Sequence, residues 1–434
     1  VFVDDGTART EITPASLFTG AIDDRWTGGT LNGILGMTNG KDKPVYWDNN
    51  TANNLATLPG WDANELCAVL VPFKNYWVAL DITKTATRYP YMMKWSSAAV
   101  PGSVPTSWDE TDVTLEAGES DIGETGDLIV DARPMGDALI VYKQNSRFAV
   151  RQTLDARIFS FQRLPGAGGA LARGCVVETP LGHMVFGNGD IYVHNGGEPQ
   201  SICDDITREF IFASLDSTNG GRAFVVANTA KNEVWFCYPE TGGSVCTLAA
   251  IYNYKGKTWT FRDLPNVTDA DSGLLDYTPS VTIDSLTLPI DSYSDSFDQD
   301  DYTPSDQRLI MATTAPRLDI ADTGGTFAGT AFTSYVERKG MVLDGDASSV
   351  KLLTRIIPRV DGPDGAVVLI EAGGSMAAEE DPIWTGSYSY TKGLDRDAPI
   401  FASGHFLSVR FSSTDERQAG IKSYDIEYEI EGGY

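Results

Sequence analysis

The chain has 434 residues, of which 42% are hydrophobic and 21% are charged, so it is long enough for two or three domains with hydrophobic cores and is not compositionally disordered. Sixty Asp and Glu against 33 Lys and Arg leave a formal net charge of −27, and a field of that sign repels phosphates, which argues against sequence-specific nucleic-acid binding. No apolar run approaches the roughly 18 to 20 residues of a membrane span.

Residues 1–60 are loop-rich, with strand fragments at 33–37 and 44–47. We expect them to form an N-terminal arm or the outer strands of a ring. From Glu65 the strand signal is stronger, because runs of Val, Leu, Tyr and Trp recur at 67–80 and 91–95. The second region therefore begins with a sheet of the size of one propeller blade.

The same pattern repeats further along the chain, in units at about 126–150, 174–202 and 222–261. Short runs of Ile, Val, Tyr and Phe, interrupted by Asn and Gly, are typical of tight antiparallel hairpins. One example is the pair Val185-Phe186 and Ile191–Val193, joined by a turn over 187–190. The uneven spacing predicts an irregular β-propeller over 61–320.

A short helix is expected at 204–215, with Ile206, Phe210 and Ile211 on one side. Residues 263–307 then contain no Lys, Arg or His and accumulate aspartates. Such a block repels itself and is typical of a solvated loop, so we interpret it as an acidic insertion in the propeller. The aspartates that we expect in this loop or on a channel wall are Asp291, Asp295, Asp298, Asp300 and Asp301.

Calcium is an alternative use of four of these side chains, Asp295, Asp298, Asp300 and Asp301, although their spacing does not match an EF-hand loop. Residues 321–434 read as a separate antiparallel β domain. Its last run, 421–430, alternates apolar and polar residues, which predicts one buried and one solvated face. We expect a sandwich or a barrel.

The sequence lacks two common hydrolase signatures, since it has no Gly-x-Ser-x-Gly and no His-Glu-x-x-His. The glycine-rich run 166–171 lacks the last glycine of a dinucleotide fingerprint and is interpreted as a turn. His183, His194 and His405 are the three histidines. Without a Cys-x-x-Cys motif to join them as zinc ligands, we interpret them as structural or surface groups. The expectation is a protein without cofactor, metal or enzymatic activity.

The five cysteines are an odd number at wide spacing, which favours reduced thiols in a protein folded in the cytosol. A disulfide between Cys237 and Cys246 across a hairpin is the alternative.

One segment is basic within this acidic chain. The interpretations are a solvated face or a surface that meets an acidic neighbouring subunit in a ring. The basic residues of this segment are Lys143, Arg147, Arg151, Arg157, Arg163 and Arg173, of which the first five are predicted interface residues.

Five runs carry a resemblance to a known family: 67–80, 139–148, 181–196, 232–239 and 251–261. With them, the chain resembles the tail hub or nozzle proteins of short-tailed bacteriophages, well over about 65–264 and loosely beyond. The resemblance implies a propeller-bearing subunit of a ring, usually hexameric, below the head-to-tail adaptor, with a central channel that conducts the DNA genome. It also implies tail fibre or spike proteins as partners and a place in the virion tail, assembled in the host cytoplasm.

The rival hypothesis is a propeller glycosidase or a carbohydrate-binding or receptor-binding tail protein. Residues 253–259 resemble the Asp-box turn of sialidases, but Lys255 stands where the Asp is expected. Among so many acidic residues, a carboxylate pair for glycoside hydrolysis stays open.

Overall fold

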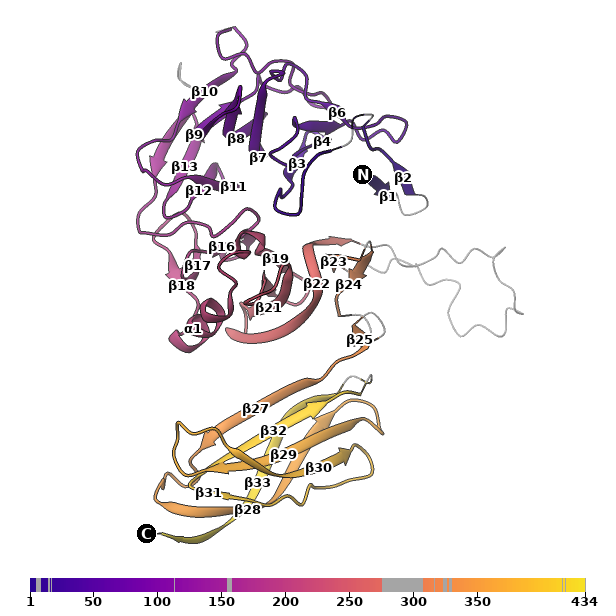
Figure 1. The fold of residues 1–434 in the computed structure, drawn as a ribbon, viewed down its shortest axis with the longest axis vertical. Helices are drawn as coiled ribbons and strands as arrows, with labels where there is room; N and C mark the ends of the chain where they lie inside the picture. The colour runs from indigo at the N-terminus through magenta and orange to yellow at the C-terminus, as the bar shows by residue number, and fades with distance from the viewer. Residues whose placement is uncertain are drawn as a thin grey trace, which may run out of the picture. The chain divides into compact units, whose positions relative to one another are not determined.

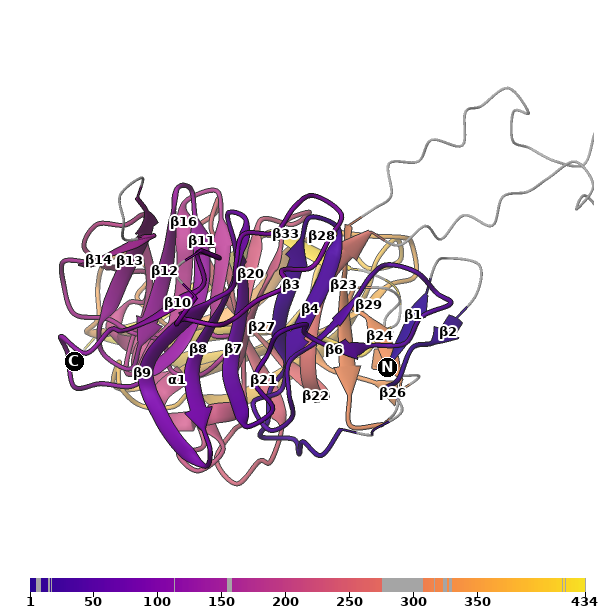
Figure 2. The ribbon, with the colours of Figure 1, turned by 90° about the horizontal axis from the view of Figure 1, so that it is seen from above.

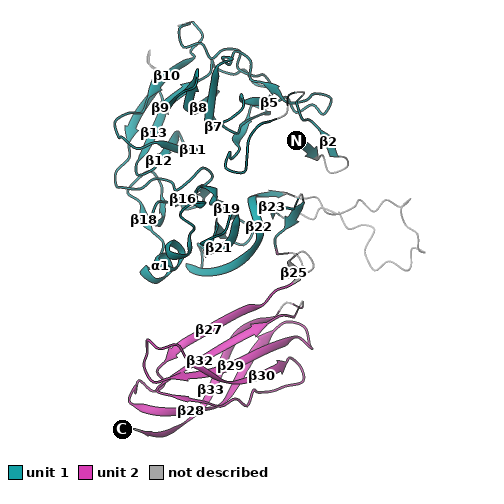
Figure 3. Cartoon of the chain, viewed as in Figure 1, with its two compact units in different colours: residues 1–321 teal, residues 322–434 magenta. Residues whose placement is uncertain are grey.

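The computed structural model describes residues 1–434 except 5–8, 15, 17, 113, 154–157, 275–306, 316, 323–325, 328–329, 416, 418 and 434. The described chain is all-β apart from one α-helix and one 3₁₀ turn, which confirms the predicted fold class. It divides into two compact units, residues 1–321 and 322–434 (Figure 3). The predicted acidic residues 291, 295, 298, 300 and 301 and the proposed calcium ligands lie outside the described residues.

Unit 1 contains four sheets that share one topology. Each is a four-stranded antiparallel meander in which neighbours in sequence are neighbours in the sheet, and the sheets follow one another in an arc (Figure 1). Together with a fifth sheet they have the arrangement of propeller blades. Sheet 1 is β3 (Thr27–Leu31), β4 (Ile34–Thr38), β5 (Val45–Trp47) and β6 (Ala56–Thr57). Sheet 2 is β7 (Glu65–Phe73), β8 (Tyr76–Lys84), β9 (Thr87–Trp95) and β10 (Gly118–Asp121). Sheet 3 is β11 (Ile129–Met135), β12 (Ala138–Lys143), β13 (Arg147–Gln152) and β14 (Phe159–Arg163). Sheet 4 is β15 (Val176–Thr179), β16 (Gly182–Phe186), β17 (Ile191–His194) and β18 (Gln200–Ser201).

Sheet 5 has six strands and is curled. The first half of its long strand β22 pairs with β21, and the second half pairs with β23. Val267 lies at the change of partner, where both pairings shift register, and a bulge at this point bends a strand. Its strands are β19 (Phe224–Asn228), β20 (Glu233–Tyr238), β21 (Cys246–Asn253), β22 (Thr258–Leu274), β23 (Gln307–Thr313) and β24 (Leu318–Ile320).

The sheets pack face to face, and β12 shows why its sequence is a continuous apolar run. Leu139 and Val141 belong to a core shared with sheet 2, whereas Ile140 and Tyr142 belong to a core shared with sheet 4. Both faces of the strand are therefore covered, as the unbroken apolar run requires. Seen from above, the axes of the strands in successive sheets are roughly aligned, although neighbouring strands alternate in direction (Figure 2).

The N-terminal region belongs to unit 1. A hairpin of β1 (Phe2–Asp4) and β2 (Arg9–Glu11) precedes sheet 1. The sequence-based division gave residues 1–60 a segment of their own, whereas the compact unit includes them, because β3 and β4 pack against β7.

The helix α1 (Asp205–Ser214) begins after Asp204, whose carboxylate accepts a hydrogen bond from the Thr207 N–H at 2.8 Å. This N-cap satisfies one of the free amides of the first turn. Of its three apolar side chains predicted to share a side, Ile211 is buried, whereas Ile206 and Phe210 are exposed. A short 3₁₀ turn, η1 (Gly220–Arg222), precedes β19.

Unit 2 is an antiparallel sandwich, one of the two forms that the sequence left open. A four-stranded sheet and a three-stranded sheet enclose one apolar core, which includes Leu353, Ile370 and Val409. No helix of the described residues is long and apolar enough to cross a membrane. The four-stranded sheet is β27 (Ser334–Met341), β32 (Phe406–Ser413), β29 (Val367–Ser375) and β30 (Ile383–Thr391). The three-stranded sheet is β31 (Ala402–Gly404), β28 (Ser349–Asp361) and β33 (Gly420–Gly433). A small hairpin of β25 (Thr326–Phe327) and β26 (Thr330–Ala331) precedes both sheets in the chain.

The packing of sheet 1 on sheet 2 depends on Gly36. A Cβ at this position would lie 2.7 Å from two ring atoms of the buried Trp77. We expect Gly36→Ala to lower the free energy of unfolding by about 1–3 kcal/mol, since overpacking forces side chains out of their rotamers. Urea unfolding of both chains, monitored by tryptophan fluorescence, measures this difference in the free energy of unfolding. Gly123→Ala, where nothing lies within 4 Å of the added Cβ, is the control, and equal effects at the two sites would contradict the packing argument.

Candidate functional site: the axial cavity

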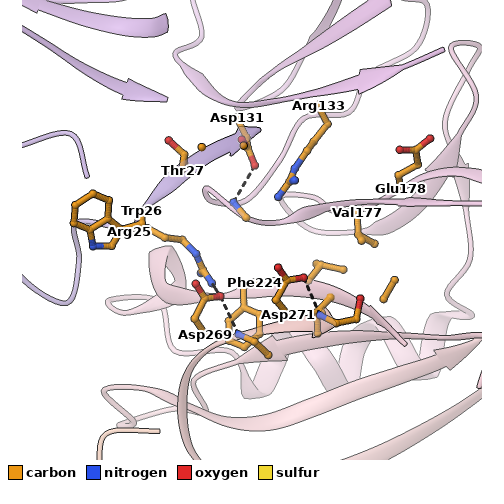
Figure 4. A pocket seen from close by; sticks show the side chains of 18 of the residues that line it. Arg25, Trp26, Thr27, Asp131, Arg133, Val177, Glu178, Phe224, Asp269 and Asp271 are labelled. Atoms are coloured by element: carbon orange, nitrogen blue, oxygen red, sulfur yellow. Dashed lines mark hydrogen bonds and ion pairs between the residues drawn. The ribbon is translucent and has the colours of Figure 1, made fainter. Parts of the chain in front are cut away.

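A cavity of about 760 Å³ lies where the innermost strands of the five sheets meet. Residues of β3, β7, β11, β15 and β19 line it, together with residues of β22, β23 and β24. Figure 4 shows the cavity with the side chains that carry its charge. The charged lining residues are Arg25, Asp131, Arg133, Glu178, Asp269 and Asp271.

The volume limits what the cavity can hold. It falls within the range of small-molecule sites, about 300 to 1,000 Å³, and corresponds to a sphere about 11 Å across. A DNA duplex is wider than either of its grooves, and the major groove of B-DNA alone is about 12 Å wide. A DNA duplex therefore cannot pass through the axis of a single chain.

Arg25 crosses one side of this cavity from the loop before β3. Its guanidinium donates to the carbonyl of Ala223 at 3.1 Å and to the carboxylate of Asp269 at 2.5 Å, and it lies 4.8 Å from the centre of the Phe224 ring. Gly174 makes room for it, because a Cβ there would come within 2.9 Å of the Arg25 Nε. The side chain thus links the segment before sheet 1 to sheet 5.

Two further groups link other sheets around the axis. Arg173, just before sheet 4, donates to the carbonyl of Ala68 in sheet 2 at 3.1 Å and to the carbonyl of Arg25 at 3.4 Å. Burial lowers the pKa of this guanidinium. Asp131 of sheet 3 is buried and accepts the Gly174 N–H at 2.9 Å. These polar groups are engaged in holding sheets together.

The histidines His183 and His194 lie opposite each other in β16 and β17, and both are buried. The hydroxyl of Tyr142 lies 2.8 Å from His183 Nδ1 and 2.6 Å from His194 Nε2. His183 Nε2 lies 2.9 Å from the carbonyl of Pro134, and the Gly196 N–H donates to His194 Nδ1.

One proton arrangement satisfies all four contacts. A carbonyl only accepts, so His183 carries its proton on Nε2 and its Nδ1 accepts from the Tyr142 hydroxyl. A backbone amide only donates, so His194 carries its proton on Nε2 and donates to the Tyr142 oxygen. Burial lowers the pKa of His183 to about 4 and, with the charge of Arg147, that of His194 to about 3. Both rings are therefore neutral structural groups at pH 7.

The predicted basic interface is wrong for its first two members. Lys143 is buried and donates to the carbonyls of Ile122 at 2.8 Å and Thr125 at 2.9 Å. Arg147 is also buried and donates to the carbonyl of Pro165 at 2.8 Å. Side chains enclosed in their own subunit do not reach a neighbouring one, so a surface role is excluded for both.

The other three residues of the predicted basic interface are Arg151, Arg157 and Arg163. Arg151 and Arg163 are exposed, and Arg151 donates to the side chain of Gln162 at 2.9 Å. Arg157 lies outside the described residues. A contact of Arg151 and Arg163 with another subunit stays a prediction.

The cysteines are free thiols. Cys237 lies opposite Ala249 in the sheet, and Cys246 does not face it. Burial raises the pKa of the Cys67, Cys175, Cys203 and Cys246 thiols to about 12. The thiols are therefore protonated and poor nucleophiles at neutral pH.

The Asp-box-like run forms the turn between β21 and β22. Asn253 accepts the backbone N–H groups of Lys255 and Gly256 at 3.1 and 2.8 Å through its side-chain oxygen. An Asx turn of this kind holds a hairpin loop. Lys255, which stands where the Asp-box motif has Asp, is exposed, and the turn is held by Asn253 instead.

No sequence pattern predicts that Arg25 joins the segment before sheet 1 to sheet 5. It stands alone in a loop, next to Asp23 and Asp24. Its partners Ala223 and Asp269 lie about 200 residues or more away, at separations of 198 and 244. Local patterns give no signal for such a contact.

No family model matches the chain, and no curated protein matches it. Among solved structures, apo AztD from Citrobacter koseri is similar at 11% identity, with a TM-score of 0.30 over 55% of this chain and 72% of that chain. The GH32 β-fructofuranosidase BmSUC1 from Bombyx mori gives 8% identity and a TM-score of 0.26 over 93% and 90%. A Synechocystis apocarotenoid oxygenase mutant gives 9% identity and a TM-score of 0.28, over 66% of this chain and 64% of that chain. We draw nothing about function from similarities at this level.

Proposed function

We propose that this chain is a structural subunit of a short-tailed bacteriophage tail, a nozzle or hub component below the head-to-tail adaptor. In this proposal it forms an oligomeric ring, with six subunits expected from the resemblance, whose acidic channel conducts the DNA genome. Its partners are further copies of the chain, the adaptor and the tail fibre or spike proteins. It is located in the virion tail after assembly in the host cytoplasm.

The observation that carries the proposal is the net charge of −27 on a propeller scaffold. Duplex DNA carries one negative charge per about 1.7 Å of its axis, and cationic side chains bind it with an affinity that rises as salt falls. An acidic wall repels the duplex and leaves it free to slide. The axial cavity is too small for a duplex, so the channel of this proposal lies between subunits.

The histidines and the axial polar groups fit a structural role. His183 and His194 are held neutral with all their nitrogens bonded, and Asp131 accepts two backbone amides. A general acid or base has to exchange a proton with substrate near neutral pH. These groups are instead committed to holding sheets together.

Native mass spectrometry of the purified chain tests the proposal. We expect a closed ring, and we expect Arg151→Glu with Arg163→Glu to weaken its assembly by reversing two exposed charges. Lys255→Glu, which reverses an exposed charge on a hairpin turn, is the matched control and should leave the ring intact. A monomer at all concentrations would contradict the proposal, and a monomer that hydrolyses a chromogenic glycoside would replace it with the glycosidase hypothesis.

A further inference from the structure

Apolar cores join successive sheets of unit 1. Sheets 1 and 2 share a cluster that contains Leu31 and Trp77. Sheets 2 and 3 share another, and a third, larger cluster spans sheets 3, 4 and 5. Within the described residues, no buried apolar cluster contains members of both sheet 1 and sheet 5.

The segment that leads into sheet 1 is joined to sheet 5 by polar contacts, in a region that we call the seam: residues 22–25 on one side, and 221–224, 244–246 and 267–269 on the other. Arg25 bonds to Ala223 and Asp269 across it. Asp23 accepts from the Arg222 Nε at 2.6 Å. The seam thus contains two ion pairs where the other contacts between sheets contain apolar cores.

The seam is also incompletely packed. A cavity of about 30 Å³, lined by Ile22, Val245 and Val267 among others, lies within it. The two acidic partners face solvent, because the side chains of Asp23 and Asp269 are 68% and 55% exposed. Water competes with such pairs, so they hold the sheets together less strongly than a buried apolar core.

We propose that unit 1 opens at the seam, and that Arg25 is the latch that keeps it closed. Arg25 lines both the axial cavity and the small cavity of the seam, so its release joins the two cavities and opens a further path to solvent between sheets 1 and 5. The device follows from the distribution of apolar and polar contacts within unit 1. It does not depend on the proposed function.

Two native cysteines, Cys246 in the seam and Cys175 in contact with it, report on its opening. The Cys246 thiol lies 3.4 Å from the carbonyl of Arg222, and the Cys175 thiol lies 3.3 Å from that of Ala223. Both are buried in the closed form. Cys67 is equally buried, but in the core between sheets 1 and 2, and serves as the internal control.

The experiment is timed labelling of the full chain with N-ethylmaleimide, with the labelled cysteines identified by mass spectrometry. In Arg25→Gln we expect Cys246 and Cys175 to be labelled on the order of tenfold faster, the factor that corresponds to one lost charge-assisted hydrogen bond. Labelling of Cys67 should not change. The positive charge of Arg25 lowers the pKa of both reporter thiols against the larger, opposite effect of burial. Its removal alone would slow labelling, so a faster rate measures exposure.

Two further variants complete the design. Asp269→Asn removes the ionic partner and keeps the arginine, so it should produce a smaller change at the same two cysteines. Arg208→Gln removes an exposed ion pair with Asp205 on α1, away from the seam, and should change none of them. Faster labelling of all three cysteines together in both seam variants, which reports global unfolding, or unchanged labelling of Cys246 and Cys175 in both, would overturn the proposal.

Discussion

Lowering the pH from about 6.5 to about 4.5 is expected to destabilise unit 1 by up to about 1.4 kcal/mol per pH unit for each of two buried histidines. His183 and His194 are neutral in the folded protein, with pKa values lowered to about 4 and about 3 by burial. In the unfolded chain they take up protons near pH 6.5. Their contribution to stability is therefore complete above about pH 7 and is lost as the pH falls from there toward the folded-state pKa values of about 4 and 3.

The variant that tests this is His183→Gln with His194→Gln. An amide keeps a donor and an acceptor but does not titrate. The difference in unfolding free energy between the native and variant chains should be constant above about pH 7. Below about pH 6 it should shrink by up to about 2.7 kcal/mol per pH unit, measured by urea titrations at each pH. His405→Gln in unit 2 is the control, and a difference that does not vary with pH would contradict the proton arrangement.

Lys94→Met is expected to cost about 3 kcal/mol or more of stability. The Lys94 ammonium is buried in sheet 2, 2.8 Å from the Glu65 carboxylate and 3.0 Å from that of Glu110. The Glu65 side chain is 9% exposed, so the substitution leaves a buried carboxylate with Lys84, at 3.5 Å, as its cation. Removing one partner of a buried pair is far more costly than removing both.

Adding Glu65→Gln to Lys94→Met should therefore recover part of the loss. Lys339→Met provides the matched control, because Lys339 pairs with a carboxylate, Asp381, that is 93% exposed. Exposed pairs of this kind contribute less than about 1 kcal/mol. Denaturant unfolding of the native chain, the two Lys94→Met variants and Lys339→Met measures the four free energies of unfolding, and Lys94→Met alone should have the lowest. If Lys94→Met were no more destabilising than Lys339→Met, the network in sheet 2 would not be a stabilising element.

Much of the fold could be predicted from the sequence, because central strands such as β12 and β16, which have a neighbour on each side, are apolar on both faces. The run Leu139–Tyr142 and the hairpin over 185–193 carry their own signal, of β-branched and aromatic residues bounded by Asn and Gly. The outermost strands of the sheets contain few such residues and carry a weaker sequence signal. The strand β10 consists of Gly118, Glu119, Ser120 and Asp121, and it is held by pairing with β9 rather than by its own strand propensity.

The site was predicted less well, because charge in a sequence does not state whether a side chain is exposed. Lys143 and Arg147 read as a basic surface, yet their cationic groups bond to backbone carbonyls inside the subunit. Arg25 gave no signal, since its partners are distant in sequence. Burial of a cation depends on carbonyl groups that only the folded chain brings together.

The central claim is that copies of this chain form a ring with an acidic lumen, and electron cryomicroscopy of the assembled protein tests it most directly. The account predicts a closed ring in which Asp and Glu side chains face a lumen wide enough for duplex DNA. A lumen lined by Lys and Arg, or a protein that remains a monomer, would contradict it.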